Sequence, residues 1–405
     1  MTARPTLLFV STQFLFPVNT GGRIRTTQIL RGLKGGRFRI VLAMPATTER
    51  LRYFRSDIQQ VADEVVHWEQ GERGMLFHYT RLRHVLHRLP IPIRTDLSNR
   101  ALAVVEKQLA AKPAVVVFDF LHGAVLSPRQ LDVPSVLFTH NVEAEIFKRH
   151  LSVARNPLLR TLWRSQFRKI EKFERHALSA FDRVVAVSER DKSQFEQNYG
   201  AKDVEVIPTG VDLDYFKPEA SGTSKTVVFT GSMDWLANID GLSYFMDEVW
   251  PLIVRDEPNA NMVVVGRSPP ADLVRRAEQR GYAWNFTYFV RDIRPHVAGA
   301  SAFVIPLRVG GGTRLKVFEA MAMGSPVVST SIGVEGLPVV AGEHYLLGDD
   351  AATLAQQTVA LLRDPERGRR LAGHARAYVE NHCSFRNAAR VFEEICLKAM
   401  SGRAG

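Results

Sequence analysis

A glycine-rich run that leads into a helix-like segment is the part of this sequence best suited to phosphate chemistry. It reads GGGTRLKVFEAMAMGSPVV between Gly310 and Val328, and its three glycines are Gly310, Gly311 and Gly312. Glycine has no Cβ, so the backbone N–H groups of such a run can approach a ligand closely. Thr313 is placed to cap a following helix, and the start of a helix attracts anions. The run therefore predicts a phosphate-binding loop.

Two charged residues follow the glycines on one face of the expected helix, which runs through Phe318 to Met323. Lys316 and Glu319 are three residues apart, so their side chains are neighbours on a helix. The lysine offers a cation for phosphate, and the glutamate offers a carboxylate for sugar hydroxyls. Sugar-nucleotide chemistry is the leading hypothesis. The alternative is an ordinary strand–loop–helix unit in which the glycines only form a turn.

The surrounding sequence alternates short β-branched runs with longer helix-like segments, which is typical of a parallel α/β sheet. The first series reads LLFVST, RIVLAM, AVVVFDF, SVLFTH and RVVAVS. A second series follows a linker near residues 218–224, and it reads TVVFTGS, NMVVVGR, NFTYFV, AFVIPLR and PVVSTS. In such sheets ligands bind at the carboxyl ends of the strands, which is where the glycine-rich run lies.

These patterns predict an α/β fold with two doubly wound parallel-sheet domains, both Rossmann-like, that face a central cleft. We expect an N-terminal acceptor-binding domain over residues 1–217 and a C-terminal nucleotide-sugar-binding domain over residues 218–384. Residues 385–405 are expected to form a helix that crosses back to the N-terminal domain.

Bulk properties narrow the function classes. The 405 residues carry a formal net charge of +11, which favours an anionic partner such as a phosphorylated substrate, a membrane surface or nucleic acid. No RNA-binding motif, zinc finger or helix-turn-helix signature is visible, so nucleic acid is not expected. No apolar run approaches the ~18 residues of a membrane-spanning helix, and the two cysteines indicate neither disulfides nor a metal site. We expect a cytoplasmic protein.

A basic amphipathic segment lies between Lys148 and Arg175. Its cations recur at Arg160, Arg164, Arg168 and Lys172, beside an apolar stripe of Leu159, Trp163, Phe167 and Ile170. Such a helix can bind the inner face of an anionic cytoplasmic membrane, where lipid-linked acceptors are found. It can equally be the solvated face of a helix that packs on the core. The sequence leaves both readings open.

Four segments carry motifs of a known family. They are THNVE at Thr139–Glu143, FDRVVAVSERD at Phe181–Asp191, VIPTGVDLDYFKP at Val206–Pro218 and the glycine-rich run. Together they resemble the retaining glycosyltransferases of family 4, which have the GT-B fold, and the resemblance covers nearly the whole chain. The stretch Val290–Gly324 is particularly similar to transferases of bacterial exopolysaccharide and surface-glycan assembly. The resemblance implies that the C-terminal domain binds the nucleotide and that the N-terminal domain supplies most acceptor contacts.

The resemblance also assigns roles in the C-terminal domain. Glu319 matches the glutamate that usually holds the donor ribose, whereas the other glutamate of the family's pair would fall at Gly311, so this sequence departs there. Ser232 and Asn238 stand where the family often has an arginine and a lysine. The cations that could replace them are Lys316, Arg314, Arg308 and Arg267. Lys316 is favoured because it shares the helical face of Glu319.

In the first domain, the resemblance points to the loop VNTGGRIRT and to a histidine at a strand end. Gly21 and Gly22 let the backbone approach the donor phosphates and the acceptor. The loop lacks the G-x-G-x-x-G spacing of a dinucleotide site, so NAD is not expected. His140 matches the family's histidine beside the donor sugar, where a neutral imidazole can hydrogen-bond a hydroxyl.

The resulting site prediction has three groups of residues. The catalytic candidates are His140, Lys316 and Glu319, and the acceptor-binding candidates are Arg25, His140 and Asn141. The donor-binding candidates are Gly21, Gly22, Gly231, Ser232, Arg267, Val290, Arg308, Gly310, Gly311, Gly312, Thr313, Arg314, Lys316 and Glu319. No metal and no other cofactor are expected, because no Asp-x-Asp pair has a plausible place and the helix dipole with Lys316 can offset pyrophosphate charge.

The predicted function is retaining transfer of a sugar from a nucleotide-sugar donor to a hydroxyl of a glycan or lipid-linked acceptor, in bacterial polysaccharide or glycoconjugate biosynthesis. The resemblance implies front-face attack without a dedicated nucleophile. Two alternatives stay open. One is a GT-B-type sugar-nucleotide epimerase, and the other is a non-catalytic sugar-nucleotide-binding partner in a glycan-assembly complex. The nucleobase, the sugar, the acceptor and the oligomeric state are also left open.

Overall fold

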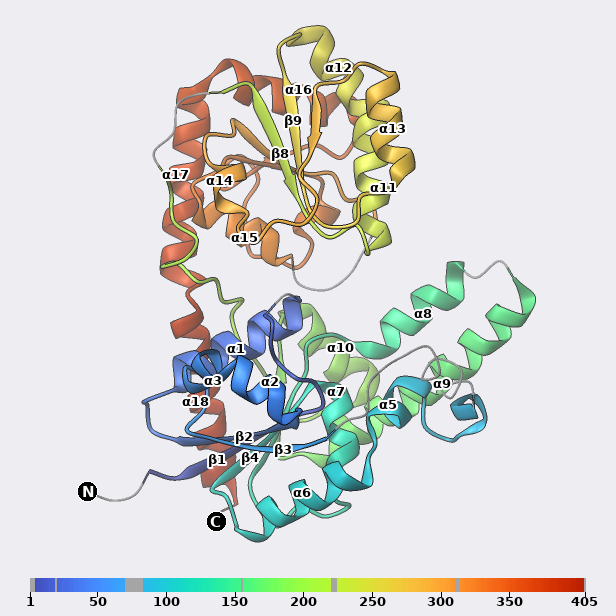
Figure 1. The fold of residues 1–405 in the computed structure, drawn as a ribbon, viewed down its shortest axis with the longest axis vertical. Coiled ribbons are helices and arrows are strands. Elements are labelled where there is room, and N and C mark those ends of the chain that lie inside the picture. The colour runs from blue at the N-terminus through green and yellow to red at the C-terminus, as the bar shows by residue number, and fades with distance from the viewer. Residues whose placement is uncertain are drawn as a thin grey trace. The chain divides into compact units, whose positions relative to one another are not determined.

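The computed structural model describes residues 4–18, 20–69, 83–153, 156–219, 224–309 and 314–403 (Figure 1). Its contacts divide the chain into two compact units. Unit 1 comprises Met1–Gly210 and Phe385–Gly405, and unit 2 comprises Val211–Ser384. The boundary precedes the predicted one after residue 217, because the segment beyond residue 210 is bonded to unit 2. Arg376 Nη1, for example, donates a hydrogen bond to the Phe216 carbonyl at 2.8 Å.

The described residues of unit 1 form a seven-stranded sheet in the order β3-β2-β1-β4-β5-β6-β7. The strands are β1 (Thr6–Ser11), β2 (Arg39–Pro45), β3 (Glu64–Trp68), β4 (Val115–Asp119), β5 (Ser135–Phe138), β6 (Arg183–Ala186) and β7 (Val204–Val206). All neighbouring pairs are parallel. The strand order reverses between β1 and β4, and a doubly wound sheet binds ligands beside such a reversal.

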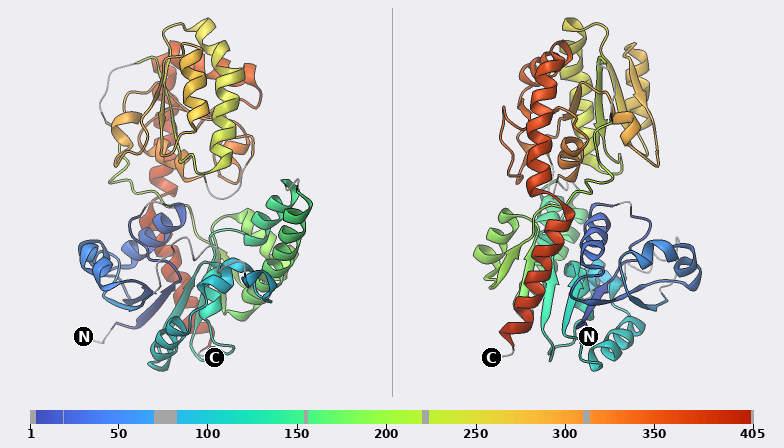
Figure 2. Two further views of the ribbon diagram at one scale, coloured as in Figure 1. Left: turned by 45° about the vertical axis from the view of Figure 1, so that its right-hand side comes forward. Right: turned by 90° about the vertical axis from the view of Figure 1, so that its left-hand side faces the viewer.

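Helices cover both faces of this sheet (Figures 1 and 2). They are α1 (Gly21–Leu33), α2 (Thr48–Tyr53), α3 (Arg55–Gln59), α5 (Ile91–Asp96), α6 (Asn99–Ala110), α7 (Phe120–Gly123), α8 (Glu143–Val153), α9 (Pro157–Ala180), α10 (Glu189–Tyr199) and α18 (Phe385–Gly402), with 3-10 turns η1 (Arg83–Leu86) and η2 (Ala124–Leu126). Alternate residues of β1 enter two separate apolar clusters, Leu7 and Phe9 in one and Leu8 and Val10 in the other. This alternation is the two-residue period of a strand buried on both faces.

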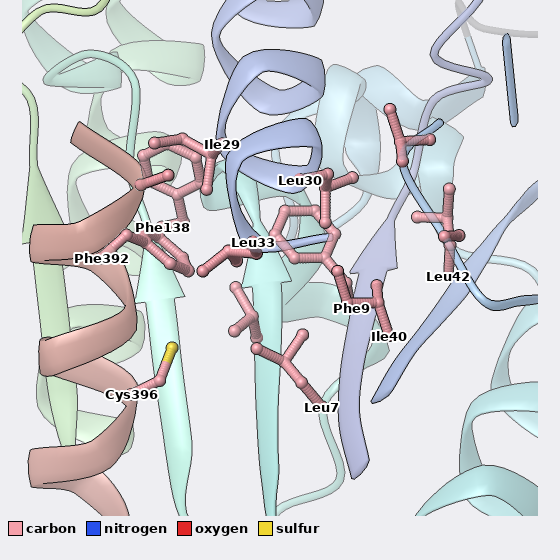
Figure 3. Packing of buried hydrophobic residues seen from close by; sticks show 14 of the residues in the cluster. Leu7, Phe9, Ile29, Leu30, Leu33, Ile40, Leu42, Phe138, Phe392 and Cys396 are labelled. Carbon is pink, nitrogen blue, oxygen red and sulfur yellow. The ribbon is translucent and has the colours of Figure 1, made fainter. Parts of the chain in front are cut away.

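The C-terminal helix α18 is part of the core of unit 1. Figure 3 shows Phe392 of this helix beside Phe138 of β5, and their ring centroids are 5.0 Å apart in an edge-to-face arrangement. Gly32 lets α1 approach α18 closely, because a Cβ at this position would lie 2.3 Å from the Cβ of Ala389. Helix α18 therefore packs against α1 and the strands β4, β5 and β6 of unit 1.

The described residues of unit 2 form a six-stranded parallel sheet in the order β10-β9-β8-β11-β12-β13. The strands are β8 (Thr226–Thr230), β9 (Asn261–Val265), β10 (Trp284–Phe286), β11 (Ala302–Ile305), β12 (Val327–Ser329) and β13 (Leu346–Leu347). Here the strand order reverses between β8 and β11. Two parallel α/β sheets confirm the predicted fold class.

The helices of unit 2 enclose one apolar cluster on each face of the sheet. They are α11 (Leu236–Tyr244), α12 (Trp250–Asp256), α13 (Ala271–Gln279), α14 (Arg294–Val297), α15 (Leu315–Ala322), α16 (Ala351–Arg363) and α17 (Pro365–His382), with a π-helical turn η3 (Phe245–Val249) and a 3-10 turn η4 (Ile332–Val334).

Candidate functional site

The predicted donor-binding residues of unit 2 lie at the carboxyl ends of its central strands. Gly231 and Ser232 directly follow β8, Arg267 follows β9 and Arg308 follows β11. β8 lies between β9 and β11 in the sheet, so these residues flank the reversal of strand order. Such a reversal leaves room for a ligand beside the strand ends.

Lys316 reaches from α15 to the loop after β8. Its Nζ donates a hydrogen bond to Asn238 Oδ1 at 2.9 Å and lies 4.4 Å from the ring centroid of Phe229. Asn238 Nδ2 in turn donates to the Ser232 carbonyl at 2.7 Å. A Cβ on Gly231 would lie 2.8 Å from the lysine Nζ. The absence of a side chain at this glycine therefore makes room for the ammonium group.

Arg267 brings a second cation to the same loop. Its Nε donates to Ser232 Oγ at 3.0 Å and forms an ion pair with Asp234 at 2.6 Å. The loops after β8 and β9 are in close contact. A Cβ on Gly266 would lie only 1.9 Å from the Gly231 carbonyl oxygen. Ser232 and Asn238, where the family often has cations, thus each contact a cation that comes from another element.

The two other candidate cations have different surroundings. Arg308 forms a two-pronged ion pair with Asp240 of α11, with a shortest nitrogen–oxygen distance of 2.7 Å. Arg314 is buried, donates to the Ile332 carbonyl at 3.3 Å and lies 5.6 Å from the ring centroid of Trp235. The guanidinium of Arg308 is thus paired with a carboxylate, whereas that of Arg314 lies near the ring of Trp235, which ends the loop after β8.

Burial shifts the pKa values of the Lys316 and Glu319 pair in opposite directions. Desolvation lowers the pKa of Lys316 to about 7, although the Glu319 carboxylate raises it. Desolvation likewise raises the pKa of Glu319 to about 7, although Lys316 lowers it. An anion bound beside Lys316 favours its charged form. The protonation of this pair is therefore sensitive to a bound diphosphate.

The helix that carries this pair begins at a different residue from the predicted one. Arg314 is the N-cap of α15, without a side-chain capping bond, whereas Thr313 was the expected cap. Gly324 follows the helix with φ of +69°, as a residue after a helix end commonly does. The residues Gly310, Gly311, Gly312 and Thr313 lie outside the described part of the chain, so the phosphate loop stays a prediction.

Val290 lies beyond the carboxyl end of the edge strand β10. It is partly buried and packs against one of the two apolar clusters of unit 2. Its neighbours Tyr288 and Phe289 are exposed, and Tyr288 has a positive φ of +57°. Such a φ is uncommon for a residue other than glycine. Strand β9 separates β10 from β8, so Val290 lies to one side of the cation-bearing loop.

In unit 1, the two predicted glycines begin α1. A Cβ on Gly22 would lie 2.3 Å from Cζ of Phe120, so this glycine lets the helix rest on the aromatic ring, while Gly21 is exposed. Phe120 has a positive φ of +62°, and its ring stacks on His140 with centroids 3.8 Å apart and planes 13° apart. The glycine loop therefore supports the predicted histidine through Phe120.

His140 is bonded to a buried aspartate that sequence reasoning missed. The Nε2 of His140 lies 2.9 Å from Oδ1 of Asp119, the last residue of β4. Thr26 Oγ1 donates to both carboxylate oxygens of Asp119 at 3.1 Å, and Ser11 Oγ donates to Oδ2 at 3.2 Å. The signal was present, because Ser11, Asp119 and His140 each stand at or just after the end of an apolar strand.

His140 is neutral at pH 7. Burial lowers its pKa, Asp119 raises it through the hydrogen bond and its charge, and Arg25 lowers it further. Arg25 is only 6% exposed, and burial lowers its pKa to about 10 against the opposing charge of Asp191. Neither Nδ1 of His140 nor Nη2 of Arg25 has a hydrogen-bond partner among the described residues. His140 and Arg25, which are both predicted to bind the acceptor, thus each have one nitrogen that could form a hydrogen bond with a ligand.

Asn141 lies next to His140 in the turn between β5 and α8, and α9 holds the end of this turn. Glu174 of α9 accepts hydrogen bonds from the N–H groups of Glu143 (2.8 Å) and Ala144 (3.0 Å) at the start of α8. Burial raises the pKa of Glu174 to about 8, although these two N–H groups lower it. Glu174 therefore couples α9 to the segment that bears two predicted site residues.

The basic segment forms the helices α8 and α9, which pack side by side (Figure 1). Four cations are exposed and form no ion pair with another described residue; they are Arg160, Arg164, Arg168 and Lys172. Of the predicted apolar stripe, Ile170 is buried and Leu159 is 50% exposed, beside Leu158 at 81%. In the described ranges, no helix is both long enough and apolar enough to cross a membrane.

Two family models match the chain. Residues 20–215 match the model described as Glycosyltransferase Family 4, and residues 224–364 match the model described as Glycosyl transferases group 1. A Klebsiella pneumoniae protein described as an uncharacterized 44.6 kDa protein in the cps region is 21% identical over 396 residues, which are 96% of this chain and 99% of that protein. A D-inositol 3-phosphate glycosyltransferase of Segniliparus rotundus is 30% identical over 223 residues, which are 48% of each protein.

Among solved structures, Anabaena HepE in complex with UDP and glucose is similar with a TM-score of 0.67. The similarity covers 96% of this chain and 98% of that one, at 16% sequence identity. At this identity the likeness establishes a shared fold.

Proposed function

Because the chain belongs to the family 4 glycosyltransferases and has their GT-B fold, we propose that it transfers a sugar, with retention of anomeric configuration, from a nucleotide-diphosphate sugar to a hydroxyl of a glycan or lipid-linked acceptor. In this proposal unit 2 binds the donor and unit 1 supplies most acceptor contacts. HepE is complexed with UDP and glucose, which supports a donor of this class. The cps-region relative supports a place in polysaccharide or glycoconjugate biosynthesis.

The observation that carries the proposal is the pair of cations at the loop after β8. Lys316 and Arg267 contact Asn238 and Ser232, beside Gly231, whose missing side chain makes room for the lysine ammonium group. A diphosphate leaving group gains negative charge in the transition state, and fixed cations stabilise that charge. Arginine binds phosphate through two N–H groups and lysine acts as a point charge, so the pair suits two phosphates.

The remaining roles follow from the charge states of the side chains. Glu319, whose pKa burial raises to about 7, accepts hydrogen bonds from ribose hydroxyls when Lys316 keeps it ionised, and neutral His140 binds a sugar hydroxyl. Lys316 and Arg267 offset the diphosphate charge, so the proposed reaction requires no metal ion and no other cofactor. Front-face attack requires no dedicated nucleophile, and the main tasks of the protein are to position the acceptor and to exclude water.

We also propose that α9 binds the inner face of an anionic membrane and brings unit 1 to lipid-linked acceptors. Its four exposed cations without ion pairs among the described residues, together with the exposed Leu158 and Leu159, support this contact. Basic residues near an anionic surface each add about 1 kcal/mol to binding.

The test is a thermal-shift screen of UDP-, GDP- and ADP-sugars, followed by product analysis with the donor that stabilises the protein. We expect one donor class to bind and the sugar to appear on an acceptor with the donor's anomeric configuration. An inverted product contradicts retention. Conversion of the donor sugar without an acceptor indicates the epimerase, and binding with no turnover on any acceptor indicates the non-catalytic partner.

A further inference from the structure

We propose that Asp119 is a positioning residue that holds His140 as the Nε2–H tautomer and thereby leaves Nδ1 as a hydrogen-bond acceptor for a sugar hydroxyl. The identity of the hydroxyl as part of a sugar rests on the proposed function. That Asp119 fixes the tautomer of His140 follows from contacts within unit 1 and does not depend on the identity of the ligand.

The first step is the direction of the bond between the two residues. Asp119 is fully buried, and the hydroxyls of Thr26 and Ser11 already donate to its two oxygens. Both oxygens of Asp119 thus act as hydrogen-bond acceptors, which is the only role open to a carboxylate. The Nε2 of His140 lies 2.9 Å from Oδ1 of Asp119. Because the carboxylate accepts, the proton of this hydrogen bond must belong to Nε2.

The second step is the orientation of the ring. Phe120 stacks on one side of His140 at 3.8 Å, and Phe138 lies 4.3 Å away at a tilt of 42°. Gly22 in turn leaves room for the Phe120 ring. A flip of the imidazole would exchange its two edges, and the close stacking opposes such a rotation. A flip would place Cε1 where Nε2 now lies and would break the bond to Asp119, so the aromatic neighbours keep Nε2 on the carboxylate.

The third step is what this leaves on the other edge of the ring. His140 Nδ1 is buried and has no hydrogen-bond partner among the described residues. In a neutral ring whose Nε2 is protonated, Nδ1 carries a lone pair. The charged groups around the ring are Asp119 on β4, Arg25 on α1 and, facing Arg25, Asp191 on α10. Burial and the nearby arginine disfavour a second proton on the ring, against the opposing effect of Asp119, so Nδ1 stays an acceptor.

The consequence is a directional requirement on the ligand. A hydroxyl can donate to Nδ1, whereas a carbonyl or ether oxygen at the same place cannot. With the opposite tautomer this preference would reverse. Asp119 thus decides which kind of oxygen His140 can bind, although Asp119 need not contact the ligand.

The direct test uses the full chain with ¹⁵N-labelled histidine, without any ligand. Two-bond ¹H–¹⁵N correlation spectra distinguish a protonated ring nitrogen from an unprotonated one, and His140→Gln identifies the His140 signals among those of the 12 histidines. We expect protonated Nε2 and unprotonated Nδ1 in the wild type at neutral pH. An Nδ1–H tautomer or an imidazolium there would overturn the proposal without any need for a variant.

Two variants separate positioning from mere packing. Asp119→Asn keeps the side-chain shape but can donate to Nε2, so we expect the Nδ1–H tautomer to gain population and kcat to fall at least about tenfold, with a smaller change in donor KM. Thr27→Val removes a buried hydroxyl of the same helix that bonds to the Arg23 and Ile24 carbonyls rather than to Asp119, so we expect the His140 tautomer in this control to stay that of the wild type. An unchanged tautomer in a folded Asp119→Asn protein contradicts the proposal.

The turnover measurements are interpreted separately from the tautomer measurements. If the tautomer responds as expected but no donor is turned over by the wild type, the proposed transfer reaction fails and the Asp119 role stands. If the wild type transfers sugar and Asp119→Asn does so at the same rate over the whole pH profile, the positioning role fails and the transfer reaction stands.

Discussion

The candidate sites of the two units handle charge differently. In unit 2, Arg267 is exposed at the loop after β8, and Lys316 beside it is partly exposed but desolvated enough to lower its pKa to about 7. In unit 1, Asp119 is fully buried, His140 is 3% exposed, and burial keeps the imidazole neutral. Solvent-accessible cations suit a ligand that arrives and leaves as an anion, whereas a buried network of fixed tautomers suits recognition of neutral hydroxyls. The predictions below test this contrast.

The largest expected effect is on membrane binding. Such an effect would show that unit 1 also binds an anionic partner through exposed cations, those of α9. Changing Arg160, Arg164, Arg168 and Lys172 to glutamine removes about 1 kcal/mol of attraction per residue, so the variant should no longer sediment with anionic vesicles. Activity on a soluble acceptor analogue should remain, and wild-type binding should weaken as salt rises.

The matched control for this variant removes four arginine charges from other helices. These arginines are Arg255, Arg275, Arg369 and Arg390, each of which forms an ion pair with a neighbouring carboxylate. The control should still bind vesicles. Equal binding of the wild type and the α9 variant, or no wild-type binding at low salt, leaves α9 as an ordinary solvated helix.

The second prediction concerns Lys316, the cation of unit 2 that is proposed to bind the diphosphate. Lys316→Ala should lower kcat by about 10²–10³, because the ammonium stabilises charge that develops on the leaving group. Lys316→Arg should rescue only in part, since the fork of a guanidinium has a different geometry. Arg255→Ala serves as the control, because this arginine of α12 pairs with Asp256 and is not a candidate for the site. A wild-type rate in Lys316→Ala would make Arg314, Arg308 or Arg267 the better candidate for binding the phosphates.

The third prediction concerns the carboxylate partner of Lys316. Glu319→Ala should weaken donor binding by about 1.5–3 kcal/mol, the range for hydrogen bonds to a charged group. Its effect on turnover should be smaller than that of Lys316→Ala, because ribose contacts change little during the reaction. Calorimetry with the best donor measures the affinity, and Glu319→Gln should be intermediate. Unchanged affinity and turnover in a folded Glu319→Ala protein remove this residue from the site.

The fourth prediction tests the neutral state of His140 in unit 1. Its pKa is lowered in the folded protein, so below the unfolded value of about 6.5 the unfolded chain binds a proton that the folded one does not. This contribution to stability is present above that pH and is lost as pH falls, by up to about 1.4 kcal/mol per pH unit. Denaturant unfolding should therefore show a weaker acid dependence for His140→Gln than for the wild type. Parallel curves would mean that His140 titrates normally.

The smallest expected effect is on metal dependence. If cations of the protein alone offset the diphosphate, addition of EDTA should leave transfer activity unchanged. Loss of activity that magnesium restores would contradict the metal-free mechanism and would reduce Lys316 and Arg267 to auxiliary contacts.

Most of the fold could be predicted from the sequence because central parallel strands are apolar on both faces. The runs that became β1, β4, β8 and β11 are buried throughout or nearly so. The strands that the sequence patterns did not reveal are β3, β7 and β13, and all three lie at sheet edges. An edge strand is partly exposed, as β3 is, so its apolar pattern is weaker.

The candidate site was less predictable, because its contacts join distant residues. The sequence favours Lys316 for its helical neighbour Glu319, but the hydrogen bond of Lys316 to Asn238 spans 78 positions and joins α15 to α11. Asp119 and His140 lie 21 positions apart on adjacent strands, and only the strand order makes them neighbours. A polar residue at the end of an apolar strand was the available signal, and it was used for His140 but not for Asp119.

The packing of α18 on unit 1 has a consequence for synthesis on the ribosome. Phe392 and its neighbours fill the face of the sheet beside β1 and α1, yet they are translated after all of unit 2. During elongation, the growing chain therefore carries an uncovered apolar face on its first unit while its second unit can already close. Unit 1 therefore completes its core only after the whole of unit 2 has been translated, although it contains the N-terminal part of the sequence.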